Sequence, residues 1–334
     1  MSITETKKVN PTTIITGFLG AGKTTYLNHI LDEFPRTNFA IIENEYGEQS
    51  IDSELIMRPE DNIIELNNGC LCCTLNDNLY EILNDLYLKR NDFSELIIEA
   101  TGVADPRGLA APFLTNPAIK KQFPLRKVIC LIDAALINQQ LKESEEAIQQ
   151  ITFSDVLLIN KTDLIDQLRT DKLIDKLKRL NPIAHILNGN QSNFPRIYHM
   201  SHDSILNNAI ESVDNKFPVA KPTSHHHHHH HDHSDGLISH TLSFDQPFDH
   251  QKLHIQLLPF LMFQSKGLYR MKGLIWIKGK DEKYVLQTVG KQIALEPIKY
   301  WKSEKKHSKI VIIGKRLGKE GLQKMFEKCF ADIN

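Results

Sequence analysis

A glycine-rich segment near the start of the chain constrains the fold more than any other feature. Residues Gly17–Thr24 read G-F-L-G-A-G-K-T and fit the pattern G-x-x-x-x-G-K-[ST]. The apolar run Thr12–Thr16 precedes the segment, and the helical pattern Lys23–Phe34 follows it. In that context, backbone N–H groups and a helix N-terminus hold phosphate groups. The sequence therefore predicts a phosphate-binding loop between a buried strand and a helix.

The side chains of this region predict a nucleotide site. Lys23 can neutralise β- and γ-phosphates, and Thr24 can offer its hydroxyl to Mg²⁺. Glu99 ends the apolar run Glu95–Glu99, where its carboxylate can hold a Mg²⁺-bound water. We therefore expect Lys23, Thr24 and Glu99 to act in catalysis. The residues expected to contact the phosphates are Gly17, Gly20, Ala21, Gly22, Lys23, Thr24 and Thr25.

A second motif selects the base. Residues Asn160–Asp163 read N-K-T-D and follow the apolar run Val156–Ile159. Guanine presents two N–H donors on one edge, and the Asp163 carboxylate can accept both, whereas adenine lacks that pair. A bidentate contact of this kind discriminates by ~1–3 kcal/mol. The Lys161 stem can cover a base face and Asn160 can anchor the loop, so the sequence predicts GTP rather than ATP.

Short apolar runs alternate with helical patterns through the first part of the chain. This β–α alternation predicts an α/β fold, a P-loop NTPase domain with a mostly parallel sheet and helices on both faces. Besides the strands already named, we expect strands at Phe39–Glu43, Asn62–Leu66, Lys127–Asp133 and Asp155–Asn160, and a helix at Asn76–Arg90.

The alternation stops at residues 215–236, which contain Pro218, Pro222 and the histidine run His225–His231. This low-complexity composition predicts a linker whose imidazoles offer weak metal sites. The expected boundaries are a GTPase domain at 1–214, the linker at 215–236 and a smaller α+β domain at 237–334. In that domain we expect strands at Leu237–Phe244, Gly273–Ile277, Tyr284–Val289 and Lys309–Ile313, and helices at Gln251–Phe263 and Lys319–Ala331.

Bulk properties exclude several classes of partner. The chain has 334 residues, with 40 Lys and Arg against 41 Asp and Glu, so no basic excess points to nucleic acid or an anionic membrane. Residues 1–11 are polar and do not resemble a signal peptide. The longest apolar stretch, Leu257–Phe263, is far shorter than the ~18 residues that a membrane span needs. We therefore expect a cytoplasmic protein with no membrane or nucleic-acid partner.

Three of the five cysteines, Cys70, Cys72 and Cys73, lie within one short segment, G-C-L-C-C-T. In a reducing compartment such a cluster is more often metal-binding or redox-active than disulfide-bonded. Thiolates are soft ligands that favour Zn²⁺, Cu⁺, Co²⁺ or Ni²⁺. In an extended segment Cys70 and Cys72 would share a side, whereas a local turn would bring all three together. The cluster predicts a metal site, with a redox switch or packed core thiols as alternatives.

Three cysteines leave a metal short of four protein ligands. The acidic segment Ile42–Glu48 follows the second strand, where a GTPase switch would lie, and Glu43 and Glu48 are the carboxylates that we favour. The other two cysteines, Cys130 and Cys329, lie in apolar or helical patterns and are expected to be core residues.

Five short segments of the chain occur together in one known family. They are G-F-L-G-A-G-K-T-T at Gly17–Thr25, E-N-E-Y-G-E at Glu43–Glu48, G-C-L-C-C-T at Gly69–Thr74, E-A-T-G-V-A-D-P at Glu99–Pro106 and N-K-T-D at Asn160–Asp163. Together they resemble the CobW-type family of metal-handling P-loop GTPases. The resemblance continues past the linker at Tyr269–Gly273, Trp276 and His307-Ser308, so it covers nearly the whole chain.

This resemblance implies a GTP-hydrolysing metal chaperone or insertase that delivers Zn²⁺, or else Co²⁺ or Ni²⁺, to a client metalloprotein. It implies that the metal residues are Glu43, Glu48, Cys70, Cys72 and Cys73. Residues 1–11 lack the cysteine and the aromatic–aliphatic character of the docking motif in eukaryotic-type zinc chaperones, so that client is not implied.

Two other functions stay open. One is a GTP-binding metal sensor or reservoir that delivers nothing, and the other is an accessory GTPase for a metalloenzyme such as urease or hydrogenase. A homodimer that depends on nucleotide or metal is also left open.

Overall fold

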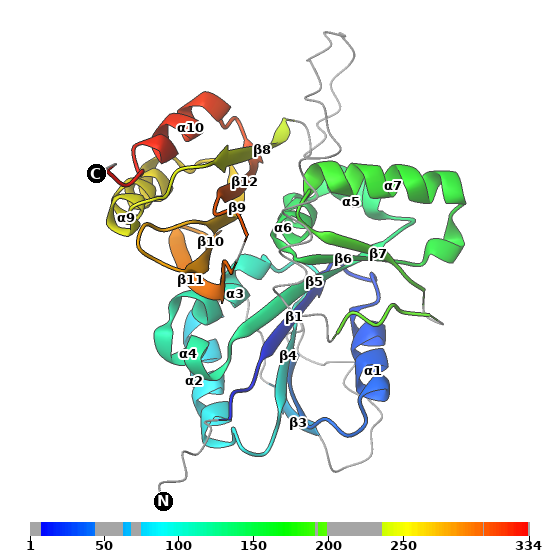
Figure 1. Cartoon of the computed structure of the whole chain (residues 1–334). Coiled ribbons are helices and arrows are strands. Elements are labelled where there is room, and N and C mark those ends of the chain that lie inside the picture. Colours follow the sequence, from blue (N-terminus) through cyan, green and yellow to red (C-terminus); the bar gives the residue numbers. More distant parts are fainter. Residues whose placement is uncertain are drawn as a thin grey trace, which may run out of the picture. The chain divides into compact units, whose positions relative to one another are not determined.

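The computed structural model describes residues 8–43, 63–67, 75–190, 193–198, 236–302 and 304–332. The chain divides into two compact units, which are described one at a time (Figure 1). The first comprises residues 1–135, 156–166 and 187–199, and the second comprises 136–155, 167–186 and 200–334. Across the described ranges, no helix combines the length and the apolar character that crossing a membrane requires.

The first unit is built on a parallel sheet. The strand order is β3-β2-β4-β1-β5-β6-β7, and all the pairings from β3 through β6 are parallel. Strands β1, β4 and β6 are buried along their whole length, as expected for a parallel sheet covered on both faces. The strands are β1 (Thr12–Gly17), β2 (Phe39–Glu43), β3 (Ile63–Asn67), β4 (Glu95–Glu99), β5 (Leu125–Asp133), β6 (Val156–Asn160) and β7 (His185–Asn188).

Helices of the first unit cover both faces of this sheet. Helix α1 (Lys23–Glu33) lies on one face, and α2 (Leu75–Leu88), α3 (Pro106–Thr115) and α4 (Pro117–Gln122) lie on the other (Figure 1). Right-handed crossovers explain why these helices lie on opposite faces. The connection from β1 to β2 through α1 crosses the sheet in one direction, whereas the connection from β3 to β4 through α2 crosses it in the opposite direction. Asn116 begins α4 by accepting the N–H groups of residues 118 and 119. The α/β prediction is confirmed.

The second unit contains an antiparallel sheet of order β11-β10-β9-β12-β8. Its hydrophobic core includes Phe244 and Phe248 near β8, Met271 of β9, Ile312 of β12 and Phe326 of α10. The sequence predicts an α+β domain for residues 237–334, the part of this unit that contains the antiparallel sheet. The strands are β8 (Leu237–Phe244), β9 (Leu268–Ile275), β10 (Glu282–Val289), β11 (Gln292–Tyr300) and β12 (Ser308–Lys315), and the helices are α5 (Ile137–Glu143), α6 (Glu145–Phe153), α7 (Gln167–Leu180), α9 (His250–Pro259, continued by a π-helical turn to Gln264) and α10 (Lys319–Glu327).

The predicted strand Gly273–Ile277 has the wrong start, because β9 begins at Leu268. Two cations, Arg270 and Lys272, interrupt the apolar pattern of β9. Both are buried, and each donates to the same oxygen of Asp155, Oδ1, at 2.6 Å from Arg270 and 2.7 Å from Lys272. An acid shared by two cations therefore allows a charged segment to be a buried strand.

Candidate functional site

The carboxyl ends of the parallel strands gather the sequence motifs at one edge of the sheet. Glu43 at the end of β2 pairs in register with Glu99 at the end of β4, and Asp133 of β5 pairs with Asn160 of β6. The glycine-rich loop follows β1, which lies between β4 and β5. Ligands of open α/β sheets bind in the crevice outside the carboxyl ends of the strands. The topology therefore concentrates the chemistry-bearing residues where such a ligand would lie.

The glycine-rich loop requires its glycines for two separate reasons. Gly20 and Gly22 have φ of 75° and 96°, in the left-handed region. A Cβ on Gly22 would lie 2.4 Å from Nδ2 of Asn160, and a Cβ on Gly102 would lie 2.6 Å from the backbone N of Leu19. The loop is thus in close contact with both the base motif and the segment after β4.

The three residues predicted to act in catalysis lie around this loop. Lys23 is buried, and its ammonium donates to the Phe18 carbonyl of the loop at 3.5 Å. The Thr24 hydroxyl donates to Oε1 of Glu99 at 2.9 Å, and the Glu99 side chain is itself buried. A hydroxyl beside a carboxylate is an oxygen donor set that suits Mg²⁺. The residues present therefore fit a magnesium nucleotide, with Lys23 on the phosphate side.

The N-K-T-D motif is anchored on the phosphate loop. Asn160 is fully buried; its amide donates to the Ala21 carbonyl at 2.9 Å, and its own Oδ1 accepts the N–H of Lys161 at 2.8 Å. Lys161 has φ of 58° and donates to the Gly20 carbonyl at 2.8 Å. Asp163 lies in a short 3-10 turn and is exposed. Asn160 and Lys161 therefore hold the N-K-T-D segment against the phosphate loop, whereas Asp163 is exposed to solvent, where a base could reach its carboxylate.

Sequence reasoning missed Asp133, which supports this arrangement. Asp133 is buried at the end of β5, and its Oδ2 lies 2.7 Å from the Lys161 ammonium. Its other oxygen accepts the N–H of Ala135 at 2.9 Å. The available signal was an acid directly after the apolar run Val128–Ile132, in the strand next to the one that carries N-K-T-D. Asp133 holds the lysine that in turn contacts the phosphate loop.

The predicted metal site is described only in part. Glu43 is half-buried at the end of β2, with Glu99 as its register partner on one side and Asn67 of β3 on the other. Strand β3 ends three residues before Cys70 in the sequence. Glu48, Cys70, Cys72, Cys73 and the run His225–His231 lie outside the described residues. Within the described ranges, no group of three or more His, Cys, Asp or Glu residues could hold a metal.

The two cysteines expected in the core are buried there. Cys130 lies in β5, and Cys329 follows α10. Burial raises the pKa of the Cys329 thiol to about 11, so it is a poor metal ligand or nucleophile at neutral pH.

The sequence matches two family models. The nucleotide-binding domain of CobW/HypB/UreG covers residues 11–188, and the cobalamin synthesis protein cobW C-terminal domain covers residues 237–330. The zinc chaperone YjiA of Escherichia coli is 32% identical over 323 residues, which cover 94% of this chain and 96% of the relative. The zinc-regulated GTPase metalloprotein activator 1 of Schizosaccharomyces pombe is 27% identical over 360 residues, covering 92% of this chain and 82% of the relative.

Two solved structures have the same architecture. The crystal structure of Zn(II)-bound YjiA GTPase from E. coli has a TM-score of 0.63 at 28% identity, and covers 97% of this chain and 100% of its own. A Zn(II)-bound triple mutant of the YjiA GTPase, with one glutamate and two cysteines replaced by alanine, has a TM-score of 0.67 at 26% identity with the same coverage. The family predicted from the motifs is thereby confirmed: this chain belongs to the CobW/HypB/UreG family of nucleotide-binding proteins and carries the CobW C-terminal domain.

Proposed function

We propose that this protein hydrolyses GTP to GDP and phosphate in the cytoplasm, and uses that cycle to load Zn²⁺ and release it to a client metalloprotein. Relatives that match nearly the whole chain are named zinc chaperones or a zinc-regulated GTPase. The observation that carries the proposal is the register of β2 and β4, which puts Glu43 beside Glu99. A carboxylate of the predicted metal site is thus the direct strand neighbour of a carboxylate of the nucleotide site.

The nucleotide half of the proposal rests on groups that the loop geometry holds in place. Lys23 would neutralise phosphate charge, and the loop N–H groups would bind phosphate oxygens. Thr24 and Glu99 would hold a Mg²⁺ ion, which would supply charge neutralisation to the phosphates when bound. Asp163 would accept both N–H donors of the guanine edge, while Asn160 and Lys161 keep its loop fixed to the phosphate loop.

Two contacts support communication between phosphate and metal. Gly102, three residues after Glu99, packs against Leu19 so closely that a Cβ on it would lie 2.6 Å from the Leu19 backbone N, which puts the segment after β4 in direct contact with the phosphate loop. Strand β4 also pairs with β2, which ends at Glu43. We expect GTP to order the segments that follow β2 and β4, and hydrolysis to relax them, so that the metal is released.

The metal half of the proposal keeps the predicted ligand set of Glu43, Glu48, Cys70, Cys72 and Cys73. Thiolates with carboxylates form a set compatible with Zn²⁺. Co²⁺ and Ni²⁺ accept the same ligands, and we favour Zn²⁺ because several relatives are named zinc chaperones or a zinc-regulated GTPase.

The decisive experiment measures Zn²⁺ affinity by competition with a chromophoric chelator, in the presence of a non-hydrolysable GTP analogue and of GDP. Because a relative without one glutamate and two cysteines is still Zn(II)-bound, bound zinc alone is not an adequate readout. The full chain should therefore carry serines in place of His225–His231, and the nucleotide-dependent part of the affinity should be compared in Cys72→Ala and Glu43→Gln variants.

We expect tighter Zn²⁺ binding with the GTP analogue, a loss of that difference in both variants, and release to the chelator during GTP turnover. Linkage requires that Zn²⁺ tighten GTP binding by the same factor. Equal Zn²⁺ affinities with the two nucleotides would refute the coupling. Coupled binding without release during turnover would instead indicate the sensor or reservoir function.

A further inference from the structure

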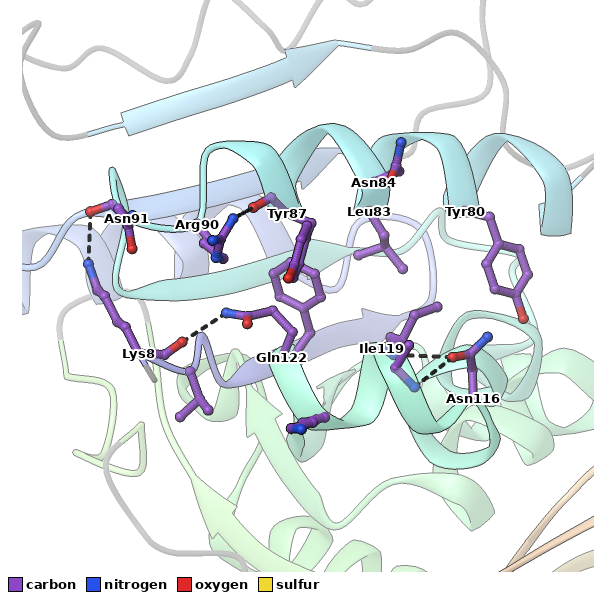
Figure 2. Close-up of a pocket in the computed structure, with 14 residues that line it drawn as sticks. Lys8, Tyr80, Leu83, Asn84, Tyr87, Arg90, Asn91, Asn116, Ile119 and Gln122 are labelled. Carbon is purple, nitrogen blue, oxygen red and sulfur yellow. Dashed lines mark hydrogen bonds between the residues drawn. The ribbon is translucent and has the colours of Figure 1, made fainter. Parts of the chain in front are cut away.

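A groove of about 890 Å³ lies between α2 and α4 in the first unit (Figure 2). Tyr80, Leu83 and Tyr87 line it from α2, and Ile119 and Gln122 line it from α4 (Figure 2). Lys8 and Val9 line one end of the groove. There the Lys8 ammonium donates to the Asn91 carbonyl at 3.0 Å. None of these residues belongs to the nucleotide site or to the predicted metal set.

The groove has an apolar floor and, on the α2 side, an aromatic wall. Leu83 and Ile119 are buried at its base, whereas Tyr80 and Tyr87 remain 40% and 44% exposed and Val9 is 48% exposed. Tyrosine offers a large apolar area together with a polar tip, and it is enriched where proteins bind other proteins. Apolar surface gathered in a groove typically marks an interaction site.

The charge of the groove has one sign. Lys8, Arg90 and Lys121 are among its lining residues, which include no aspartate or glutamate. Among the described residues, none of these three cations forms an ion pair with a carboxylate. The Arg90 guanidinium instead lies 4.4 Å from the Tyr87 ring centroid, which aligns a cation with an aromatic wall. The groove therefore favours an occupant that carries acidic groups for these cations and apolar groups for the tyrosines and the floor.

The position of the groove relates it to the metal motif. Helix α2 begins at Leu75, two residues after Cys73 in the sequence. At a rise of ~1.5 Å per residue, Tyr80 lies about 8 Å along the helix axis from that start. A partner held in the groove would thus lie on the helix that directly follows the thiolates, and transfer to it would benefit from a raised local concentration.

We propose that the groove between α2 and α4 binds an acidic, amphipathic peptide segment of the protein that receives the metal. This proposal rests on the function proposed above and adds the chemistry of the client. A second copy of the chain fits the groove less well, because a two-fold contact of groove on groove would bring these cations no carboxylate: the lining includes no aspartate or glutamate.

The test uses fluorescein-labelled peptides of alternating Asp or Glu with Leu or Phe, titrated against the full chain and followed by anisotropy. Peptides with Lys in place of the acids serve as the sequence control. The groove variant is Lys8→Glu with Lys121→Glu, since both side chains are exposed and line the groove. The matched control is Lys89→Glu, an exposed lysine that follows α2 outside the lining.

We expect the acidic peptides to bind, the basic peptides not to bind, and the groove variant to lose about tenfold in affinity, with less than a twofold change in Lys89→Glu. Thermal unfolding of each variant checks the fold. Equal losses in both variants, binding of the basic peptides, or salt-insensitive binding would overturn the proposal, as would dimerisation through this face. The GTP-dependent Zn²⁺ affinity of the groove variant should be unchanged, so failure of the docking surface is distinguishable from failure of the chaperone function.

Discussion

Removing the carboxylate of Asp155 should strongly destabilise the second unit. The side chains of Asp155, Arg270 and Lys272 are only 8%, 4% and 3% exposed. Asp155→Ala would leave two buried cations without the acid that they share. Breaking a buried ion pair by removing one partner costs about 3–5 kcal/mol, whereas replacing such a group by apolar residues is often neutral.

The two cations should differ in how they tolerate this loss. Arg270 also donates to the carbonyls of Thr152 and Ser154, at 3.2 and 2.7 Å, so it keeps partners without Asp155. The Lys272 ammonium is the more compact charge, and burial lowers its pKa. Adding Lys272→Met to Asp155→Ala should therefore restore at least ~1 kcal/mol of the free energy of unfolding. A double-mutant cycle measures this coupling between the two positions.

Urea unfolding of the full chain, followed by circular dichroism, measures these changes. Asp175→Ala is the control because Asp175 is 65% exposed, and it should shift stability by less than ~0.5 kcal/mol. Since the folded-state pKa of Lys272 is lowered, its charge costs stability at low pH, and the Asp155→Ala defect should shrink as pH rises towards ~10.4. This account of the buried acid and its two cations would be refuted if Asp155→Ala lost less than ~1 kcal/mol of stability. It would also be refuted if the effects of Asp155→Ala and Lys272→Met were strictly additive.

Three further predictions concern other sites. Gly22→Ala should abolish binding of a fluorescent GTP analogue, because its Cβ would lie 2.4 Å from Asn160 Nδ2; near-normal affinity would mean that the loop adapts. Asp133→Ala should weaken GTP binding by about tenfold, since Lys161 loses a charged partner at 2.7 Å, and calorimetry that finds no change would exclude a supporting role. Stability contributed by the neutral Cys329 thiol, whose pKa burial raises to about 11, should be lost as pH rises from ~8.5 towards that value. Alkaline unfolding of a Cys329→Ala variant should lack this component, and an identical pH profile would contradict it.

The sequence was most informative where one physical rule dominated. Buried parallel strands read as continuous apolar runs, so Phe39–Glu43 and Glu95–Glu99 were predicted with their observed bounds. The glycine-rich and N-K-T-D motifs also place their residues on the carboxyl edge of the sheet. Their contacts with ligands stay predictions, as do the metal ligands and the domain boundaries at 214 and 236.

What the sequence did not reveal depends on long-range pairing. Strand β11 was not predicted because Pro297 and half-exposed polar residues interrupt its apolar pattern. The sheet tolerates Pro297 because β11 is an edge strand. The predicted start of β9 was wrong because Arg270 and Lys272 are buried only by pairing with Asp155, which is far away in the chain. Asp133 was overlooked for the same reason, since its importance comes from Lys161 on another strand.

The separation of Asp155 from its cations also has a consequence during synthesis of the chain. Arg270 and Lys272 lie 115 and 117 residues after Asp155. At ~5–20 residues per second, the ribosome adds them roughly 6–23 s after Asp155. Strand β6, with Asn160 at its far end, is therefore complete well before the buried charge at its start can be neutralised. The nascent chain must keep that end hydrated until β9 emerges, so the buried ion pair forms only after more than one hundred further residues have been made.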